Sequence, residues 1–229
     1  MGFKRMFDCV EVHEGEPMRV ITGGVPYIPG DTLQEQEKYL QAHDRQILGM
    51  LLNEPRGMPA TVISLIVPPK DPQAAAATLF ACGDAWTLHS GATVIATATA
   101  LLETGMIPMQ EPVTEFNLEI PAGLVPIRAE CKNGKVTRCT FTSLPTFAAG
   151  LDQTVDVPSL GKVTIDVAWG GQGFFAIIDA VQFDGLVLDS EHAREIRRLS
   201  AAVTQAAKEQ LHPVHPDYPD LGVGVSIMY

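Results

Sequence analysis

Histidine and carboxylate side chains lie close together near the N-terminus of this chain. His13 is followed directly by Glu14, and Glu16 comes two residues later. An imidazole beside carboxylates suits general-base chemistry, because neighbouring charges shift the imidazole pKa. The same residues also suit a structural turn at Glu14-Gly15-Glu16, and both interpretations stay open here.

A second histidine pair lies near the C-terminus, in the segment His212-Pro213-Val214-His215-Pro216. Two imidazoles this close could ligate a metal ion. The prolines beside both histidines favour a rigid surface loop instead, so we expect no metal site. The glycine pairs at 23–24 and 170–171 lack a following Lys-Ser/Thr, so they do not predict a phosphate-binding loop or a nucleotide site.

A run of small and apolar residues begins near Ser90 and extends to about Glu103. Ser90 or Thr93 is the predicted N-cap of a helix here, and Gly105 the predicted C-cap. Because small or apolar residues occupy every face, the helix should be buried all round. We therefore expect a central helix, at about 91–103, with strands wrapped around it.

The rest of the chain reads as strands and two outer helices. Thr32 and Glu35 form a predicted capping box before a helix at 33–52, and the apolar spacing predicts a further helix at about 190–210. The predicted strands are 6–13, 17–22, 58–67, 76–81, 114–120, 124–130, 136–142, 155–157, 163–168, 174–179 and 218–229.

The four cysteines, Cys9, Cys82, Cys131 and Cys139, form no CxxC pair. The dipeptide Asn133-Gly134 predicts a two-residue hairpin turn between the last two of them. In that register Lys132 pairs with Lys135 and Cys131 with Val136, so the two thiols are not opposite each other. We expect four reduced, mostly buried thiols.

The bulk composition indicates a folded chain that avoids anionic partners. The 229 residues are 46% hydrophobic and 19% charged, with a formal net charge of −11 and a pI near 4.9. An acidic surface repels phosphates, so no nucleic-acid partner is expected. No apolar run approaches the ~20 residues that span a bilayer, and no secretory signal follows Met1. We expect no membrane partner and a cytoplasmic location.

Residues 12–30, reading VHEGEPMRVITGGVPYIPG, combine an acidic residue, an arginine, paired glycines and paired prolines in a specific order. This segment resembles the opening of the proline racemase family, which includes hydroxyproline epimerases and trans-3-hydroxyproline dehydratases. The similarity continues in IPAGLV at 120–125 and in VAWGGQGFFAIIDA at 167–180. It covers nearly all of residues 6–229.

The resemblance implies an α/β (α+β) fold of two halves like those of diaminopimelate epimerase. Each half has a curved sheet wrapped around a central helix. Residues 1–110 would form the first half, with the central helix at about 91–103. Residues 111–229 would form the second half, left incomplete, with the outer helix at about 190–210.

The resemblance also implies a site at the N-terminus of the central helix, with substrate between the halves. Ser90 stands where the family usually has a catalytic cysteine, so it is the candidate acid/base residue, although it could equally serve only as a helix cap. Gly91, Ala92 and Thr93 would offer backbone N–H groups to the substrate carboxylate. His89 is adjacent, but successive side chains point apart, so we assign it no role.

The chain departs from the family pattern at several positions. Ala92 replaces the usual histidine, and Met58 follows Arg56-Gly57 where the family has histidine. The family's second acid/base residue lies in an Asp-Arg-Ser-Pro-Cys-Gly-Thr-Gly segment, which would fall beyond Tyr229. The sequence could therefore be part of a longer protein.

The resemblance implies racemisation or epimerisation at the α-carbon of proline or hydroxyproline by proton abstraction, with no cofactor and no metal. The partner would be a small-molecule imino acid, and a homodimer is a further expected partner arrangement. Two alternatives stay open. One is a trans-3-hydroxy-L-proline dehydratase, which needs only one good base, and the other is a non-catalytic relative that binds a ligand or protein.

Overall fold

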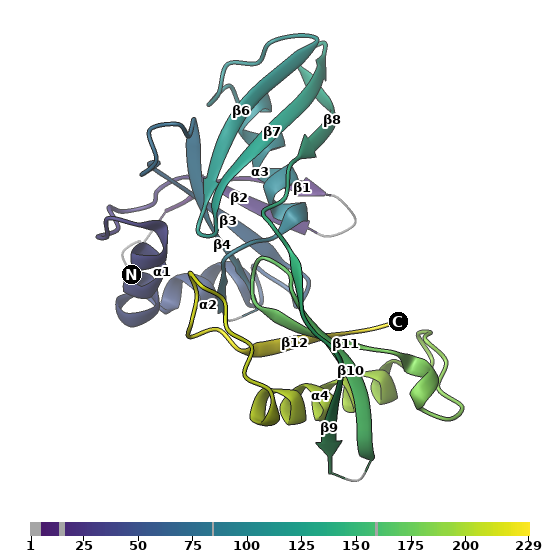
Figure 1. The fold of residues 1–229 in the computed structure, drawn as a ribbon. Coiled ribbons are helices and arrows are strands. Elements are labelled where there is room, and N and C mark those ends of the chain that lie inside the picture. Colours follow the sequence, from purple (N-terminus) through teal and green to yellow (C-terminus); the bar gives the residue numbers. More distant parts are fainter. Residues whose placement is uncertain (1–5, 14–16, 84, 159) are drawn as a thin grey trace. The chain divides into compact units, whose positions relative to one another are not determined.

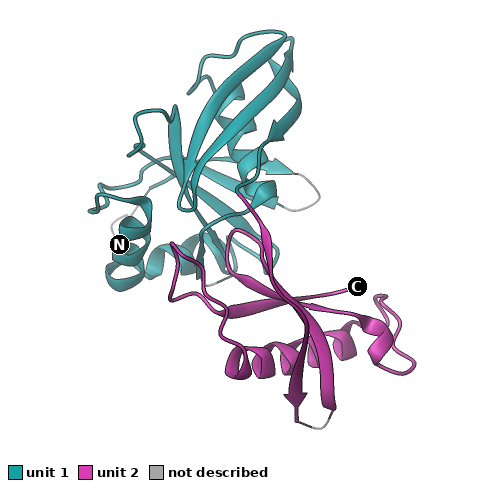
Figure 2. Ribbon diagram, viewed as in Figure 1, with its two compact units in different colours: residues 1–144 teal, residues 145–229 magenta. Residues whose placement is uncertain are grey.

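The computed structural model describes residues 6–229 except 14–16, 84 and 159. The chain forms two compact units, residues 1–144 and 145–229 (Figure 2). The sequence suggested a division near 110, where helix gives way to strands. In the structure the boundary lies further along the chain, at residue 144. The strands between residues 113 and 141 pair with the first sheet and not with the second.

Unit 1 contains an eight-stranded sheet in the order β1-β2-β3-β4-β6-β7-β8, with β5 paired to β4 (Figure 1). The strand pairs β2–β3 and β4–β6 are parallel, and the other pairs are antiparallel. The bounds are β1 (Asp8–His13), β2 (Pro17–Gly23), β3 (Val62–Val67), β4 (Ala76–Cys82), β5 (Ala85–Thr87), β6 (Val113–Ile120), β7 (Gly123–Lys132) and β8 (Lys135–Phe141).

The helix predicted at 33–52 is two helices, α1 (Leu33–His43) and α2 (Gln46–Leu52). The predicted capping box is confirmed. The Thr32 hydroxyl accepts from the Glu35 amide, and the Glu35 carboxylate accepts from the Thr32 amide. The break falls at Asp44, a poor helix former whose backbone leaves helical geometry at φ −140°. The buried leucines and isoleucines of both helices pack with those of β2, β3 and β4.

The predicted central helix is confirmed as α3 (Gly91–Glu103). It contacts β1, β2, β3, β7 and β8, and eight of its residues are buried. Val94, Ala98 and Leu101 pack in one core with residues of β4, β6 and β7. Alanine and threonine on its other faces let the strands approach closely, which explains how a sheet can curl around it. The helix ends at Thr104, and Gly105 follows with φ +74°.

Glu103 ties the C-terminal end of α3 to the β7–β8 hairpin. One carboxylate oxygen lies 2.6 Å from Lys135 Nζ, and the other accepts from the Val136 amide at 3.0 Å. Burial alone raises the pKa of Glu103, but these hydrogen bonds and the Lys135 charge together hold it below its usual range. The hairpin itself has the predicted register, with φ 55° at Asn133 and 72° at Gly134.

Unit 2 is a four-stranded sheet, in the order β12-β11-β10-β9, with α4 on one face (Figure 1). Its elements are β9 (Phe147–Val157), β10 (Gly161–Trp169), β11 (Phe174–Ile178), a 3-10 turn at Ala180–Gln182, α4 (Ala193–Gln210) and β12 (Val223–Met228). The predicted outer helix is confirmed. It buries Leu199 and Val203 against β9, β11 and β12 and exposes its charged face.

The opposite face of the unit 2 sheet is apolar near its β12 edge. Phe175 and Ile177 pair with Val225 and Ile227 across the parallel β11–β12 ladder. The last two are 48% and 49% exposed. In the described part of unit 2, α4 is the only α-helix and it lies on the other face.

Candidate active site

Ser90 occupies the N-cap of α3. Its backbone is extended, with φ −151° and ψ 113°, and its hydroxyl accepts from the Thr93 amide at 3.4 Å. Its Oγ also lies 2.7 Å from Thr93 Oγ1. Serine suits this position because its short side chain can satisfy an amide that has no acceptor within the helix. The predicted capping role is therefore confirmed.

The first turn of α3 presents backbone donors. Gly91 is half-buried, Ala92 is exposed and Thr93 is buried. The first N–H groups of any helix lack intrahelical acceptors, and the helix dipole adds partial positive charge at the same place. A carboxylate seated here would receive hydrogen bonds from the backbone without needing a lysine or arginine.

Phe141, from the end of β8, forms an apolar wall beside this turn. A Cβ added at Gly91 would lie 3.0 Å from Phe141 Cζ, so the ring closely approaches the glycine backbone. The His89 ring centroid is 6.1 Å from that of Phe141. Any larger residue at position 91 would have to displace the phenylalanine. The sequence does not point to Phe141, because nothing in its local pattern links β8 to residue 91.

His89 is a partly buried side chain. Burial lowers its pKa, because the charged imidazolium loses solvation. Its Nε2 is buried and has no hydrogen-bond partner among the described residues. The Ser90 hydroxyl bonds to Thr93 and not to this imidazole, as expected for adjacent side chains that point apart.

Among the described residues, the Ser90 hydroxyl has no hydrogen bond to a base that would turn it into a strong nucleophile or proton acceptor. A serine hydroxyl has a pKa far above 7 and needs such a partner to abstract a proton. In the present arrangement it can donate or accept a hydrogen bond and return a proton to a strongly basic carbon. This chemistry is weaker than that of a thiol in the same position.

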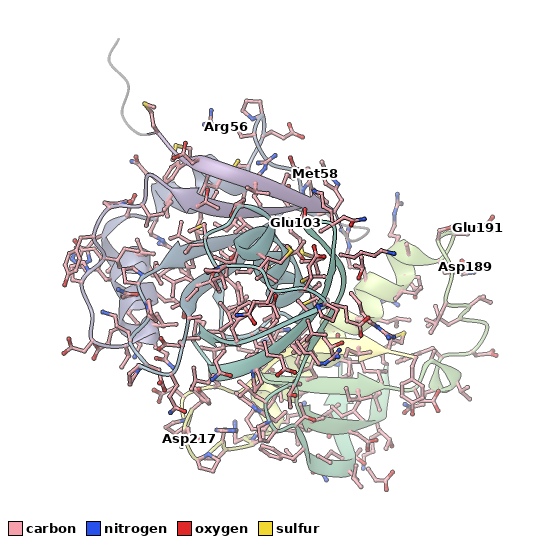
Figure 3. All side chains as sticks on the ribbon, turned by 90° about the horizontal axis from the view of Figure 1, so that it is seen from above. Arg56, Met58, Glu103, Asp189, Glu191 and Asp217 are labelled. Atoms are coloured by element: carbon pink, nitrogen blue, oxygen red, sulfur yellow. The ribbon has the colours of Figure 1, made fainter. Side chains whose placement is uncertain are left out.

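The turn between α2 and β3 carries Arg56-Gly57-Met58 (Figure 3). Arg56 Nε donates to the Met50 carbonyl at 2.9 Å, and Met58 is 51% exposed. A Cβ at Gly57 would lie 1.9 Å from the Leu52 carbonyl oxygen, so only glycine fits there. Met58 offers no titratable group where the family pattern has a histidine.

The structure describes the surroundings of both histidine segments, the one at His13 and the one that contains His215. His13 lies 3.8 Å from Glu11, but Glu14 and Glu16 lie outside the described residues, so the general-base cluster stays a prediction. The ring centroids of His215 and Trp169 lie 4.2 Å apart, and His215 Nδ1 accepts from the Asp217 amide. This packing agrees with a rigid loop.

Within the described ranges, no group of three or more His, Cys, Asp or Glu side chains could hold a metal ion.

In the part of the chain that the structure describes, no helix combines the length and the apolar character needed to cross a bilayer.

Relatives of this chain include proteins named as a hydroxyproline epimerase and a probable proline racemase. A 4-hydroxyproline 2-epimerase from Streptosporangium roseum is 41% identical over 217 residues. That match covers 94% of this chain and 65% of the relative, so the chain spans about two thirds of the relative's length.

Two solved structures share the fold. A hydroxyproline epimerase from Agrobacterium vitis, solved with trans-4-hydroxy-L-proline bound, matches with a TM-score of 0.88 and 38% identity, covering 99% of this chain and 67% of that one. A probable proline racemase from Agrobacterium radiobacter K84, solved with carbonate bound, matches with a TM-score of 0.88 and 34% identity. That match covers 97% of this chain and 66% of the other. The family model for proline racemase matches residues 9–229. This chain therefore belongs to the proline racemase family.

Proposed function

We propose that the chain binds a proline-type imino acid at the N-terminus of α3 and supports cofactor-independent proton transfer at its α-carbon. Epimerisation of 4-hydroxyproline or racemisation of proline is the reaction proposed. The observation that carries this proposal is the geometry of the first turn, where Ser90 caps a buried helix and Gly91 and Ala92 begin it. The named activity of the relative from Streptosporangium roseum supports the choice of substrate class.

In this proposal the backbone of α3 stabilises the charge that develops during the reaction. Loss of the α-proton moves negative charge onto the substrate carboxylate. The fixed N–H groups of Gly91 and Ala92, together with the helix dipole, would stabilise this developing charge. They would therefore stabilise the transition state more than the bound substrate. The apolar wall of Phe141 would keep water away from one side of this turn.

Ser90 would face the α-carbon as a hydrogen-bond donor and weak acid. Because the hydroxyl is not activated, it suits delivery of a proton better than removal of one. Inversion at the α-carbon also requires an acid/base group on the opposite face. None of the residues proposed for this site supplies that second group.

The unactivated hydroxyl also favours a second candidate, dehydration of trans-3-hydroxy-L-proline. In that reaction a base removes the α-proton and the 3-hydroxyl leaves as water, which gives a cyclic enamine. Only one strong base is needed, which none of the residues proposed for this site supplies, and a hydroxyl such as that of Ser90 could protonate the departing group. The third reading is a relative that binds the imino acid without turning it over.

The test is α-proton exchange in D2O. The full chain would be incubated separately with L-proline, trans-4-hydroxy-L-proline and trans-3-hydroxy-L-proline, and the Hα signal followed by NMR. We expect loss of the Hα signal with at least one substrate. New diastereomer signals would identify epimerisation, and loss of the 3-hydroxyl would identify dehydration. If all three substrates keep their Hα signals, catalysis by this chain is contradicted.

Two further expectations stay proposals, the cytoplasmic location and the homodimer. The apolar face formed by Phe175, Ile177, Val225 and Ile227 is the surface that a second copy would cover. Burial of such apolar area is the usual driving force for association.

A further inference from the structure

Three hydroxyl side chains form a fully buried network between α3 and the sheet. Ser64 on β3, Thr78 on β4 and Thr97 on α3 each have 0% exposure. Ser64 Oγ lies 2.6 Å from Thr78 Oγ1 and 2.7 Å from Thr97 Oγ1. Thr97 Oγ1 is also 2.6 Å from the Thr93 carbonyl oxygen. Buried polar groups cost free energy unless they are paired, so these contacts hold the helix at one position on the strands.

The Thr97 hydroxyl has two acceptors within hydrogen-bond distance. Each hydroxyl has one proton, and the Thr93 carbonyl can only accept. The Thr97 hydroxyl is placed to donate both to Ser64 Oγ, at 2.7 Å, and to the Thr93 carbonyl oxygen, at 2.6 Å. The single proton of Thr97 can therefore be donated to either acceptor, and in the contact between Ser64 and Thr78 either hydroxyl can be the donor. Thr78 Oγ1 is also placed to donate to the carbonyl oxygens of Leu65 and Leu79, at 3.2 and 3.3 Å.

Thr93 connects this network to the site. Its carbonyl is the end of the buried chain of hydroxyls, while its own hydroxyl and amide bond to Ser90 Oγ. Thr93 is itself 0% exposed. The Thr93 peptide group, in the first turn of α3, is thus held from inside the fold.

We propose that Thr97 is a positioning residue for the site at the N-terminus of α3. With Ser64 and Thr78 it fixes the first turn, and so the direction of the Gly91 and Ala92 amides and of the Ser90 hydroxyl. This inference rests on the proposed function, because preorganised donors matter most where charge develops in a reaction. Small misplacements of such donors lower turnover strongly.

The chain offers a matched set of variants. Thr97→Val keeps the shape of the side chain and removes the hydroxyl, and Ser64 can still pair with Thr78. Thr97→Ser restores the hydroxyl. Thr99→Val is the control, because Thr99 Oγ1 donates to the Ile95 carbonyl at 2.9 Å in the same way as Thr97 donates to Thr93. No contact joins the Thr99 hydroxyl to a strand among the hydrogen bonds of the described residues.

Amide hydrogen exchange of the full chain, read by NMR, tests the positioning without any substrate. In Thr97→Val we expect the Thr93 and Val94 amides to exchange at least about tenfold faster, while mid-helix amides such as that of Leu101 change less than about threefold. Thr97→Ser should restore the parent pattern, and Thr99→Val should leave these two amides unchanged. A uniform increase along α3, or no change at Thr93 and Val94, would overturn the proposal.

Turnover provides the second measurement. For a substrate whose Hα exchanges, we expect Thr97→Val to lower kcat about tenfold with a smaller change in KM, and Thr97→Ser to recover it. A parent chain without Hα exchange would contradict the proposed function alone, because amide exchange would still decide the positioning role. Unchanged kcat in Thr97→Val, in a parent that does exchange, would contradict the link between the network and the site.

Discussion

Replacing Ser90 with alanine is expected to lower α-proton exchange by at least about 100-fold, the usual contribution of a positioned acid/base group. The change removes the hydroxyl that faces the proposed α-carbon site and the cap on the Thr93 amide. The measurement is the rate of Hα loss in D2O with whichever imino acid the parent chain accepts.

Loss of a helix cap by itself costs about 1 kcal/mol of stability, so a cap control is needed. Thr32→Ala removes the N-cap of α1, which also accepts from an amide three residues later. It should destabilise the chain by a similar amount and leave Hα exchange unchanged. Parent-like exchange in Ser90→Ala would show that Ser90 is only a cap.

Ser90→Cys should act in the opposite direction. A thiol has a pKa near 8.5, lowered further at a helix N-terminus, so a useful fraction is thiolate at neutral pH. We expect Hα exchange to rise at least about tenfold and to increase with pH as the thiol ionises. A rate no higher than that of the parent would indicate that residue 90 does not face the α-carbon.

Glu37 is expected to make the stability of unit 1 fall as pH rises. This carboxyl on α1 is 8% exposed, and its Oε1 has no hydrogen-bond partner among the described residues. Burial raises its pKa from 4.5 to about 8. The folded state therefore keeps a proton that the unfolded state loses near pH 4.5.

The sign of the effect follows from this difference. Below pH 4.5 both states hold the proton, and the stabilising contribution is complete. Between pH 4.5 and about 8 the unfolded state is ionised and the folded state is not, so the free energy of unfolding decreases with pH. We expect a total decrease of about 3–5 kcal/mol from this one group.

Glu37→Gln should remove most of that slope. Urea unfolding would be followed at several pH values by fluorescence in a Trp169→Phe background, so that Trp86 reports unit 1 alone. The control is Glu191→Gln, which makes the same charge change at an exposed position of unit 2 (Figure 3). If the free energy of unfolding falls with pH equally in the parent and in Glu37→Gln, the claim that Glu37 is buried and protonated in the folded state is contradicted.

The central helix could be predicted because its signal is local. Small and apolar residues on every face require burial, Ser90 marks the start, and Gly105 marks the end. The Asn133-Gly134 hairpin was predictable for the same reason, since two residues with positive φ determine the register. Family resemblance then placed the site at the start of this helix.

Features that depend on contacts distant in sequence could not be predicted. The break between α1 and α2, the pairing of β6 with β4, and the close approach of Phe141 to Gly91 depend on how the sheet closes. The Thr97 network joins residues 33 positions apart, on a strand and a helix. The four-residue spacing of Thr93 and Thr97 placed them on one helix face, but it did not indicate a partner on β3.

The most direct test of the account is an NMR titration of the ¹⁵N-labelled chain with trans-4-hydroxy-L-proline, using its carboxamide as the control ligand. We expect the largest amide shifts at Gly91, Ala92 and Thr93, and much smaller shifts with the carboxamide, because the helix N-terminus binds the carboxylate. Shifts concentrated elsewhere in the chain, or equal shifts with both ligands, would contradict the placement of the site at the start of α3.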